Sequence, residues 1–147
     1  MIPATDATVL AFDFGTRRIG VAVGNTVLRI AQPLVTIEGA PADTHAAIAA
    51  LIGEWMPGRL VVGLPTHADG TPHAMTAAAL RFARQLGESF ALPVATVDER
   101  WTTEVAQGEL NAAGKGGRAG RALRDQVAAQ LILQAWFDDG DARSGHS

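Results

Sequence analysis

The segment Asp13-Phe14-Gly15-Thr16-Arg17-Arg18-Ile19-Gly20 sets a carboxylate, a hydroxyl and two guanidinium groups between two apolar stretches. Residues 8–12 and 19–24 are rich in β-branched and small side chains, which is typical of short buried strands. An ionised Asp13 at the end of a buried strand is costly unless a cation or several hydrogen-bond donors compensate its charge. A metal or phosphate-handling site would explain this placement, and the alternative is an Asp that caps a hairpin turn.

The composition indicates one folded domain. Of 147 residues, 48% are hydrophobic and 18% are charged, so we expect a single domain over residues 1–138 and a polar, disordered tail over residues 139–147. The absence of cysteine excludes disulfides and thiolate metal sites. A net charge of −3 argues against an indiscriminate polybasic nucleic-acid binder. We see no signal peptide and no apolar stretch of membrane length, which predicts a cytoplasmic protein without a membrane partner.

The order of the predicted elements indicates an α/β fold. Apolar runs predict strands over residues 8–12, 19–24, 34–37, 60–64 and 93–97, and helical periodicity predicts helices over residues 43–55, 72–90, 102–114 and 121–137. Strands joined by hairpins come first, and strands joined by helical crossovers come later. This order predicts a mixed five-stranded sheet, antiparallel in its first three strands and then parallel, with helices on both faces. With an acid at the end of the first strand, it is a ribonuclease H-like arrangement.

Two carboxylates are expected at the same edge of this sheet. Asp13 ends the first predicted strand and Glu99 follows the last. If these strands are parallel, their carboxyl ends meet at one edge, which is where ligands bind in such sheets. Two carboxylates on rigid strands suit a hard divalent cation, Mg²⁺ or alternatively Mn²⁺.

A third carboxylate, Asp125, lies on the predicted inner stripe of the last helix. Helical spacing puts it on one face with Ala128, Ala129, Ile132 and Trp136, and puts Gln126, Gln130 and Gln134 on the opposite stripe. An acid on the buried side of a helix needs a partner. The partner would be a metal shared with the two strand acids, or an ion pair with a neighbouring arginine of the helix, Arg121 or Arg124.

Two groups of residues are candidates to bind phosphate. In the first turn, these are Thr16, the backbone of Gly15 and the donor fork of Arg18. Before Asp125, four positive charges fall within ten residues with no acid between them: Lys115, Arg118, Arg121 and Arg124. A flexible basic loop there would hold backbone phosphates without reading sequence, and the alternative is a solvated linker.

Four motifs in sequence resemble those of the YqgF family, also called RuvX. They are Asp13-Phe14-Gly15-Thr16-Arg17-Arg18-Ile19-Gly20-Val21-Ala22, Val62-Gly63-Leu64-Pro65 with Asp69-Gly70-Thr71, Val97-Asp98-Glu99-Arg100 with Thr102-Thr103, and Asp125-Gln126-Val127-Ala128-Ala129. The resemblance covers about residues 8 to 138. It implies a ribonuclease H-like nuclease that processes the 5′ end of pre-16S ribosomal RNA in ribosome biogenesis, or alternatively a Holliday-junction resolvase.

Carried over by position, the resemblance implies that Asp13, Glu99 and Asp125 are the catalytic metal ligands. It also points to Arg100, Thr102 and Thr103 as nucleic-acid contacts. The partner would be structured RNA or branched DNA, bound by a monomer or a homodimer. This sequence departs from the family pattern at Trp101 and in a basic loop diluted by glycine.

Two readings of another class stay open at this point. Asp-x-Gly-Thr before a hairpin also resembles the phosphate loop of the actin and sugar-kinase superfamily, which would make the chain an ATP-binding module, although it has the length of only one of the two folds required. The other is a non-catalytic RNA-binding assembly factor. His67 and His73 flank a predicted turn, where they would line the cleft or lie on the surface.

Overall fold

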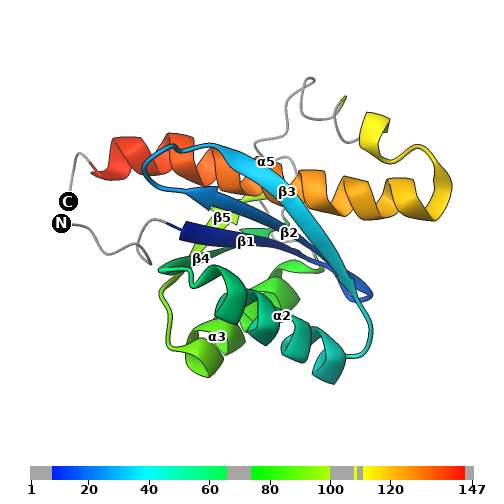
Figure 1. The fold of residues 1–147 in the computed structure, drawn as a ribbon, viewed down its shortest axis with the longest axis horizontal. Coiled ribbons are helices and arrows are strands. Elements are labelled where there is room, and N and C mark those ends of the chain that lie inside the picture. Colours follow the sequence, from blue (N-terminus) through cyan, green and yellow to red (C-terminus); the bar gives the residue numbers. More distant parts are fainter. Residues whose placement is uncertain (1–7, 66–73, 100–107, 109–110, 145–147) are drawn as a thin grey trace.

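The computed structural model describes residues 8–65, 74–99, 108 and 111–144, and its strands form one mixed sheet (Figure 1). The strands are β1 (Thr8–Phe14), β2 (Arg18–Asn25), β3 (Ala31–Glu38), β4 (Arg59–Leu64) and β5 (Val94–Asp98). Their order across the sheet is β3-β2-β1-β4-β5. β2 is antiparallel to both β1 and β3, whereas β4 is parallel to both β1 and β5. The predicted mixed five-stranded sheet is confirmed, and β1 lies at its centre.

Helices cover both faces of the sheet, as predicted. α2 (Pro41–Trp55) and α3 (Thr76–Phe90) lie on one face, and the long helix α5 (Gly117–Ser144) crosses the other (Figure 1). Pro41 begins α2, where its missing N–H costs nothing and its backbone angle suits a helix. Among the described residues, no helix is both long and apolar enough to cross a membrane.

The alternation of side chains along β1 decides which face receives Asp13. Leu10 and Phe12 are buried in the apolar layer under α2 and α3, whereas Val9 and Ala11 are buried against α5. Successive side chains of a strand point to opposite faces. Asp13 therefore points to the α5 face. On this face β1 carries the smaller side chains, Val9 and Ala11, and on the other face it carries the larger ones, Leu10 and Phe12.

The boundaries of the helices differ from the prediction at several ends. α3 begins at Thr76 instead of residue 72, and the predicted helix over residues 102–114 falls mostly outside the described residues. α5 begins at Gly117 instead of residue 121 and continues to Ser144 instead of residue 137. It therefore includes part of the predicted basic loop and extends into the segment predicted as a disordered tail.

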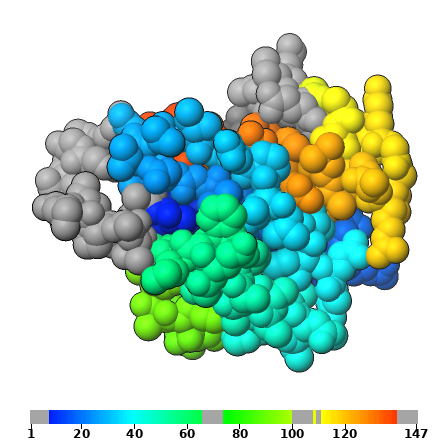
Figure 2. All heavy atoms as spheres, in the orientation of Figure 1, coloured from blue at the N-terminus to red at the C-terminus, as the bar shows by residue number. Residues whose placement is uncertain are grey.

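Tertiary contacts explain the early start of α5 despite its poor helix formers. Arg118 forms an ion pair with Glu38 of β3 at 2.8 Å, and the Thr36 hydroxyl donates a hydrogen bond to the Ala122 carbonyl at 2.6 Å. Such tertiary contacts outweigh a weak intrinsic helix propensity. Local sequence patterns report only the propensity, so they predicted a later start for α5. In Figure 2 the yellow start of α5 lies at one end of the molecule, beside the dark-blue turn that joins β1 and β2.

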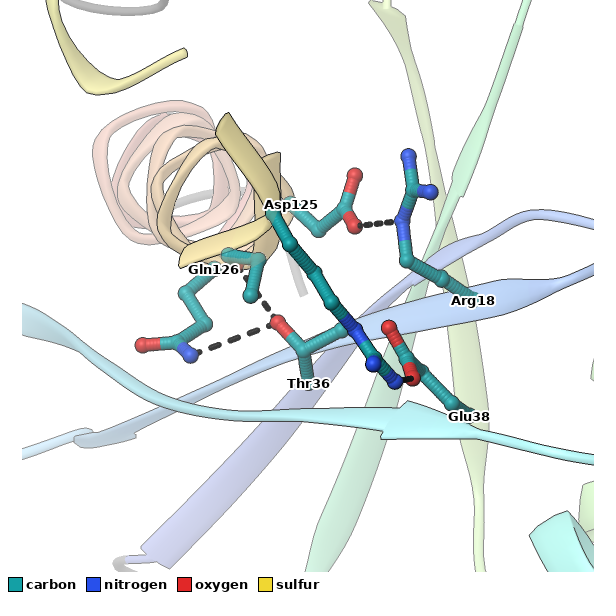
Figure 3. A network of polar contacts seen from close by, with 7 residues as sticks. Arg18, Thr36, Glu38, Asp125 and Gln126 are labelled. Carbon is teal, nitrogen blue, oxygen red and sulfur yellow. Dashed lines mark hydrogen bonds and ion pairs between the residues drawn. The ribbon is translucent and has the colours of Figure 1, made fainter. Parts of the chain in front are cut away.

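The glutamine stripe of α5 corrects a prediction, because it does not lie away from the sheet. Gln134 accepts a hydrogen bond from the Ala31 N–H at 3.0 Å and donates one to the Arg29 carbonyl at 3.0 Å. Gln130 donates to the Ala31 carbonyl at 3.2 Å, and Gln126 donates to the Thr36 hydroxyl at 3.3 Å (Figure 3). β3 is an edge strand, whose backbone needs such partners. The stripe thus attaches α5 along this edge.

Candidate active site

Asp13 and Glu99 share a side-chain hydrogen bond at the carboxyl ends of β1 and β5. The pKa of Glu99 is raised to about 8, most by burial and then by the Asp13 charge and the shared hydrogen bond. The pKa of Asp13 is raised to about 6, most by burial and then by the charge of Asp125, against the lowering effects of Arg124 and of the hydrogen bond with Glu99. The bond favours the neutral form of Glu99 and the ionised form of Asp13. At neutral pH, Glu99 therefore donates the shared proton to the Asp13 carboxylate.

Two glycines make the space around this carboxyl pair. Gly20 pairs with Asp13 across the β1–β2 ladder, and Gly63 follows Val62, the β4 partner of Phe12. A Cβ on Gly20 would overlap the carbonyl oxygen of Asp125. A Cβ on Gly63 would overlap the Ile132 side chain and stand 3.1 Å from the carboxyl carbon of Glu99. Both neighbours of Asp13 thus lack side chains, so α5 and Glu99 can approach it closely.

Asp125 reaches this site from α5 and is held there by Arg18. The Nε of Arg18 donates to Oδ2 of Asp125 at 2.6 Å, and the two side chains are 35% and 15% exposed. Figure 3 shows both side chains pointing toward one another, with the terminal nitrogens of Arg18 beside the carboxylate. The charge of Asp125 is close enough to raise the pKa of Asp13. The ion-pair alternative for Asp125 is thus realised, but its partner is Arg18 and not the predicted Arg121 or Arg124.

The turn between β1 and β2 lines a cavity of about 280 cubic ångström beside Asp13 and Asp125, which we call the acidic cavity. Its lining includes two of the acids and the three predicted phosphate contacts of the turn: Asp13, Asp125, Gly15, Thr16 and Arg18. Within the described part of the chain, no three acidic or histidine side chains are grouped closely enough to hold one metal ion. The structure thus brings Asp13 and Glu99 into contact, and it places Asp125 near them with its carboxylate turned to Arg18.

Comparison with known protein families identifies the family of this chain. The model of the RuvX family, described as "Holliday junction resolvase", matches residues 7–139. The chain belongs to the RuvX family. Among curated relatives, it is 54% identical over 132 residues to a protein of Dechloromonas aromatica named "Putative pre-16S rRNA nuclease", covering 89% of this chain and 90% of the relative. A Nitrosomonas europaea protein of the same name is 50% identical over 145 residues, covering 98% of both chains.

Solved structures similar to this RuvX protein show the same fold at low sequence identity. The structure of Thermus thermophilus RuvC with a Holliday junction substrate aligns with a TM-score of 0.58 at 18% identity, over 95% of this chain and 96% of that one. Fowlpox virus resolvase with Holliday junction DNA aligns with a TM-score of 0.57 at 7% identity, over 90% and 97%. At this identity the likeness concerns the fold, which confirms the predicted ribonuclease H-like class.

The predicted basic contacts of the RuvX chain have separate environments. Lys115 and Arg121 are exposed near the start of α5, and Arg124 is close enough to Asp13 to lower its pKa. Arg118 is paired with Glu38, whose pKa it lowers through their hydrogen bond. The predicted contacts Arg100, Thr102 and Thr103 lie outside the described residues, as do His67, His73 and Trp101.

The candidate site also depends on residues to which the sequence patterns assigned no role. Gly20 and Gly63 admit α5 and Glu99, while Thr36 and Gln126 hold the start of α5 against β3. A glycine inside an apolar strand is itself a signal, because it marks a place where another backbone or a ligand comes close. The role of Thr36 left no such signal, since its partners lie 86 and 90 positions away.

Proposed function

We propose that this protein is a divalent-metal-dependent nuclease that processes the 5′ end of pre-16S ribosomal RNA, a role that belongs in the cytoplasm, where bacterial ribosomes are assembled. Asp13, Glu99 and Asp125 would be its metal-binding and catalytic residues. The observation that carries the proposal is the hydrogen-bonded Asp13–Glu99 pair at the ends of two parallel-running strands, with Asp125 beside it. The substrate is proposed from the names of two relatives that are 54% and 50% identical to this chain.

The chemistry of the carboxyl pair fits a hard divalent cation, Mg²⁺ or Mn²⁺. Two carboxyl groups are held together with raised pKa values, because burial disfavours both charged forms, and the charge of a neighbouring acid adds to this effect: Asp125 for Asp13, and Asp13 for Glu99. A cation relieves both effects, and carboxylate oxygens are the ligands that Mg²⁺ prefers. When bound, such an ion supplies an activated water and neutralises charge on the phosphodiester.

The residues of the site must rearrange in two ways before all three acids become ligands. Glu99 must lose the proton that it shares with Asp13, because a carboxylate binds metal in its deprotonated form. Asp125 must exchange its pairing with Arg18 for the metal. Arg18 would then be released toward the substrate phosphate, for which its planar donor fork is well suited.

The surroundings of the acids would hold the substrate backbone. Gly15, Thr16 and Arg18 line the acidic cavity, and Lys115, Arg118, Arg121 and Arg124 lie at the start of α5. The first turn of α5 contains no acidic residue. The positive end of the α5 dipole and the charges of the arginines both attract phosphate, and their attractions therefore add. Arg100, Thr102 and Thr103 complete the proposed contact set.

Cleavage of a pre-16S RNA bearing its 5′ extension, with Mg²⁺, tests the proposal. Asp13→Asn should reduce the rate at least about 100-fold, since even residues behind metal ligands are worth 10–100-fold. Glu54→Gln removes an exposed carboxylate of α2 outside the site and should keep the wild-type rate. Full activity in Asp13→Asn would contradict the ligand assignment, and RNA binding without hydrolysis would favour an assembly factor.

A Holliday-junction resolvase is the second candidate, because the matching family model carries that description. A resolvase makes two symmetric cuts and needs two active sites, so it would act as a dimer. A four-way DNA junction offered under the same conditions separates the candidates. Paired symmetric cuts in the junction with no cut in the RNA precursor would replace the ribosomal assignment.

A further inference from the structure

A second cavity lies on the other side of the turn that joins β1 and β2. It has a volume of about 330 cubic ångström and is lined by this turn, the start of α2 and the middle of α3. We refer to it as the α2–α3 cavity. The residues that decide its chemistry are Phe14, Thr44, His45, Ile48, Phe82 and Gln85.

The floor of the α2–α3 cavity is apolar and aromatic. The rings of Phe14 and Phe82 stack with their centroids 4.7 Å apart and their planes 29° from parallel, and Ile48 is fully buried behind them. The volume is at the lower end of the range for small-molecule sites. An apolar, ring-lined space of this size suits one flat aromatic group better than an extended chain.

The rim of the α2–α3 cavity carries polar groups that could recognise the edge of such a group. The Thr44 hydroxyl donates to the Pro41 carbonyl at 2.9 Å and keeps its own lone pairs for accepting. The exposed Gln85 amide offers both donors and an acceptor. The His45 ring is held by stacking on Phe90, with centroids 5.2 Å apart and planes 20° from parallel. An apolar floor with a donor-and-acceptor rim is how proteins hold a nucleobase taken out of its stack.

The two cavities share one wall. Phe14, Gly15, Thr16 and Arg17 line both the acidic cavity and the α2–α3 cavity. A nucleic-acid strand whose phosphate lies against Asp13 and the turn therefore has its next base beside the mouth of the second cavity. Arg17, exposed on the shared turn, offers a cation to the phosphate between them.

We propose that the α2–α3 cavity binds one unstacked nucleobase of the nucleic-acid substrate, next to the phosphate that lies at Asp13. This inference rests on the proposed nuclease function and adds a requirement to it. A paired base must leave its stack to enter, whereas a base in a single strand or at a distortion enters at lower cost. The cavity thus directs cleavage to single-stranded or distorted positions.

The test uses single-stranded RNA spanning the 5′ cleavage site of the 16S precursor, with one abasic residue placed at each position in turn. Affinity is measured without metal, so that no RNA is cut. For the wild type, one position beside the cleavage site should weaken binding about tenfold when abasic, since stacking one base on aromatic side chains has an effect of this order. Thr44→Trp fills the mouth of the cavity and should bind the intact RNA as weakly as the wild type binds that abasic RNA, with no further loss on the abasic RNA.

Ala50→Trp is the matched control, because it adds the same side chain to an exposed position on the opposite side of α2. It should behave as the wild type, and both variants should keep the wild-type Tm. Binding that is indifferent to every abasic position, or unchanged in Thr44→Trp, would overturn the inference and leave the proposed nuclease standing. Failure to bind any of these RNAs would overturn both.

Discussion

Gly20 of β2 lies so close to Asp125 of α5 that a Cβ on Gly20 would overlap the carbonyl oxygen of Asp125. The same glycine pairs with Asp13 in the β1–β2 ladder. One missing side chain therefore sets how closely the helix acid approaches the strand acid. The charge of Asp125 raises the pKa of Asp13, which shows that the approach has electrostatic consequences.

Gly20→Ala should displace the start of α5 and lower activity about tenfold or more, because small misplacements of catalytic groups are costly. It should also destabilise the fold by about 1–3 kcal/mol, the usual cost of overpacking. Cleavage rate and urea unfolding measure the two effects. The control is Gly53→Ala in α2, where a Cβ meets nothing within 4 Å and no loss is expected. Equal behaviour of the two variants would show that close approach at Gly20 does not matter.

Arg18 would compete with a metal ion for Asp125. Removing its charge should therefore strengthen metal binding while it weakens catalysis. Arg18→Gln should bind Mg²⁺ about fivefold more tightly, since a partly exposed ion pair is worth up to about 1 kcal/mol. Its cleavage rate should nevertheless fall, because the proposed phosphate contact is lost. The Mg²⁺ dependence of Tm measures the first effect. Arg17→Gln, exposed in the same turn, should leave that dependence unchanged, and so should Arg18→Gln if Asp125 is not a ligand.

The Asp13–Glu99 pair predicts that the metal-free protein loses stability as pH rises. The pKa of Glu99 is raised from 4.5 to about 8 on folding, so the folded state holds this proton more tightly than the unfolded state. Its contribution to stability is therefore present below about pH 4.5 and is lost as pH rises to about 8. Asp13, raised from 3.8 to about 6, adds a loss of the same sign at lower pH.

Thermal unfolding in EDTA between pH 5 and 8 measures this effect. Glu99→Gln should show a shallower decline and exceed the wild-type Tm at pH 8 by about 3 °C or more. Added Mg²⁺ should restore the wild type at pH 8 but not further stabilise the variant to the same extent. Parallel profiles of wild type and Glu99→Gln would mean that the shared proton is absent.

Thr36 connects edge strand β3 to the start of α5, so its hydroxyl should matter for both stability and activity. Thr36→Val removes the bond to the Ala122 carbonyl and the acceptor for Gln126, and should cost about 1–2 kcal/mol. Activity should fall several-fold, because Asp125 lies on this turn of the helix. The control is Thr96→Val at an exposed position of β5. A normal rate in Thr36→Val would separate this anchor from the placement of Asp125.

Local patterns in the sequence determined the sheet, its order of elements, the position of Asp13 near the end of β1 and that of Glu99 just after β5. The apolar runs of β1 and β4 are properties of neighbouring residues, and a strand has only two faces on which to put a side chain. Helical spacing likewise determined that Asp125 turns toward the sheet.

Only the tertiary structure decided which groups meet. Arg18 and Asp125 are 107 positions apart, and no periodicity distinguishes Arg18 from Arg121 or Arg124 as the partner of this acid. The same holds for the glutamine stripe, which binds edge strand β3 because α5 crosses the sheet there. The shared proton of Asp13 and Glu99 and the α2–α3 cavity also arise from packing. Local patterns specify the face of an element, whereas the distance between two faces depends on every side chain placed, or missing, between them.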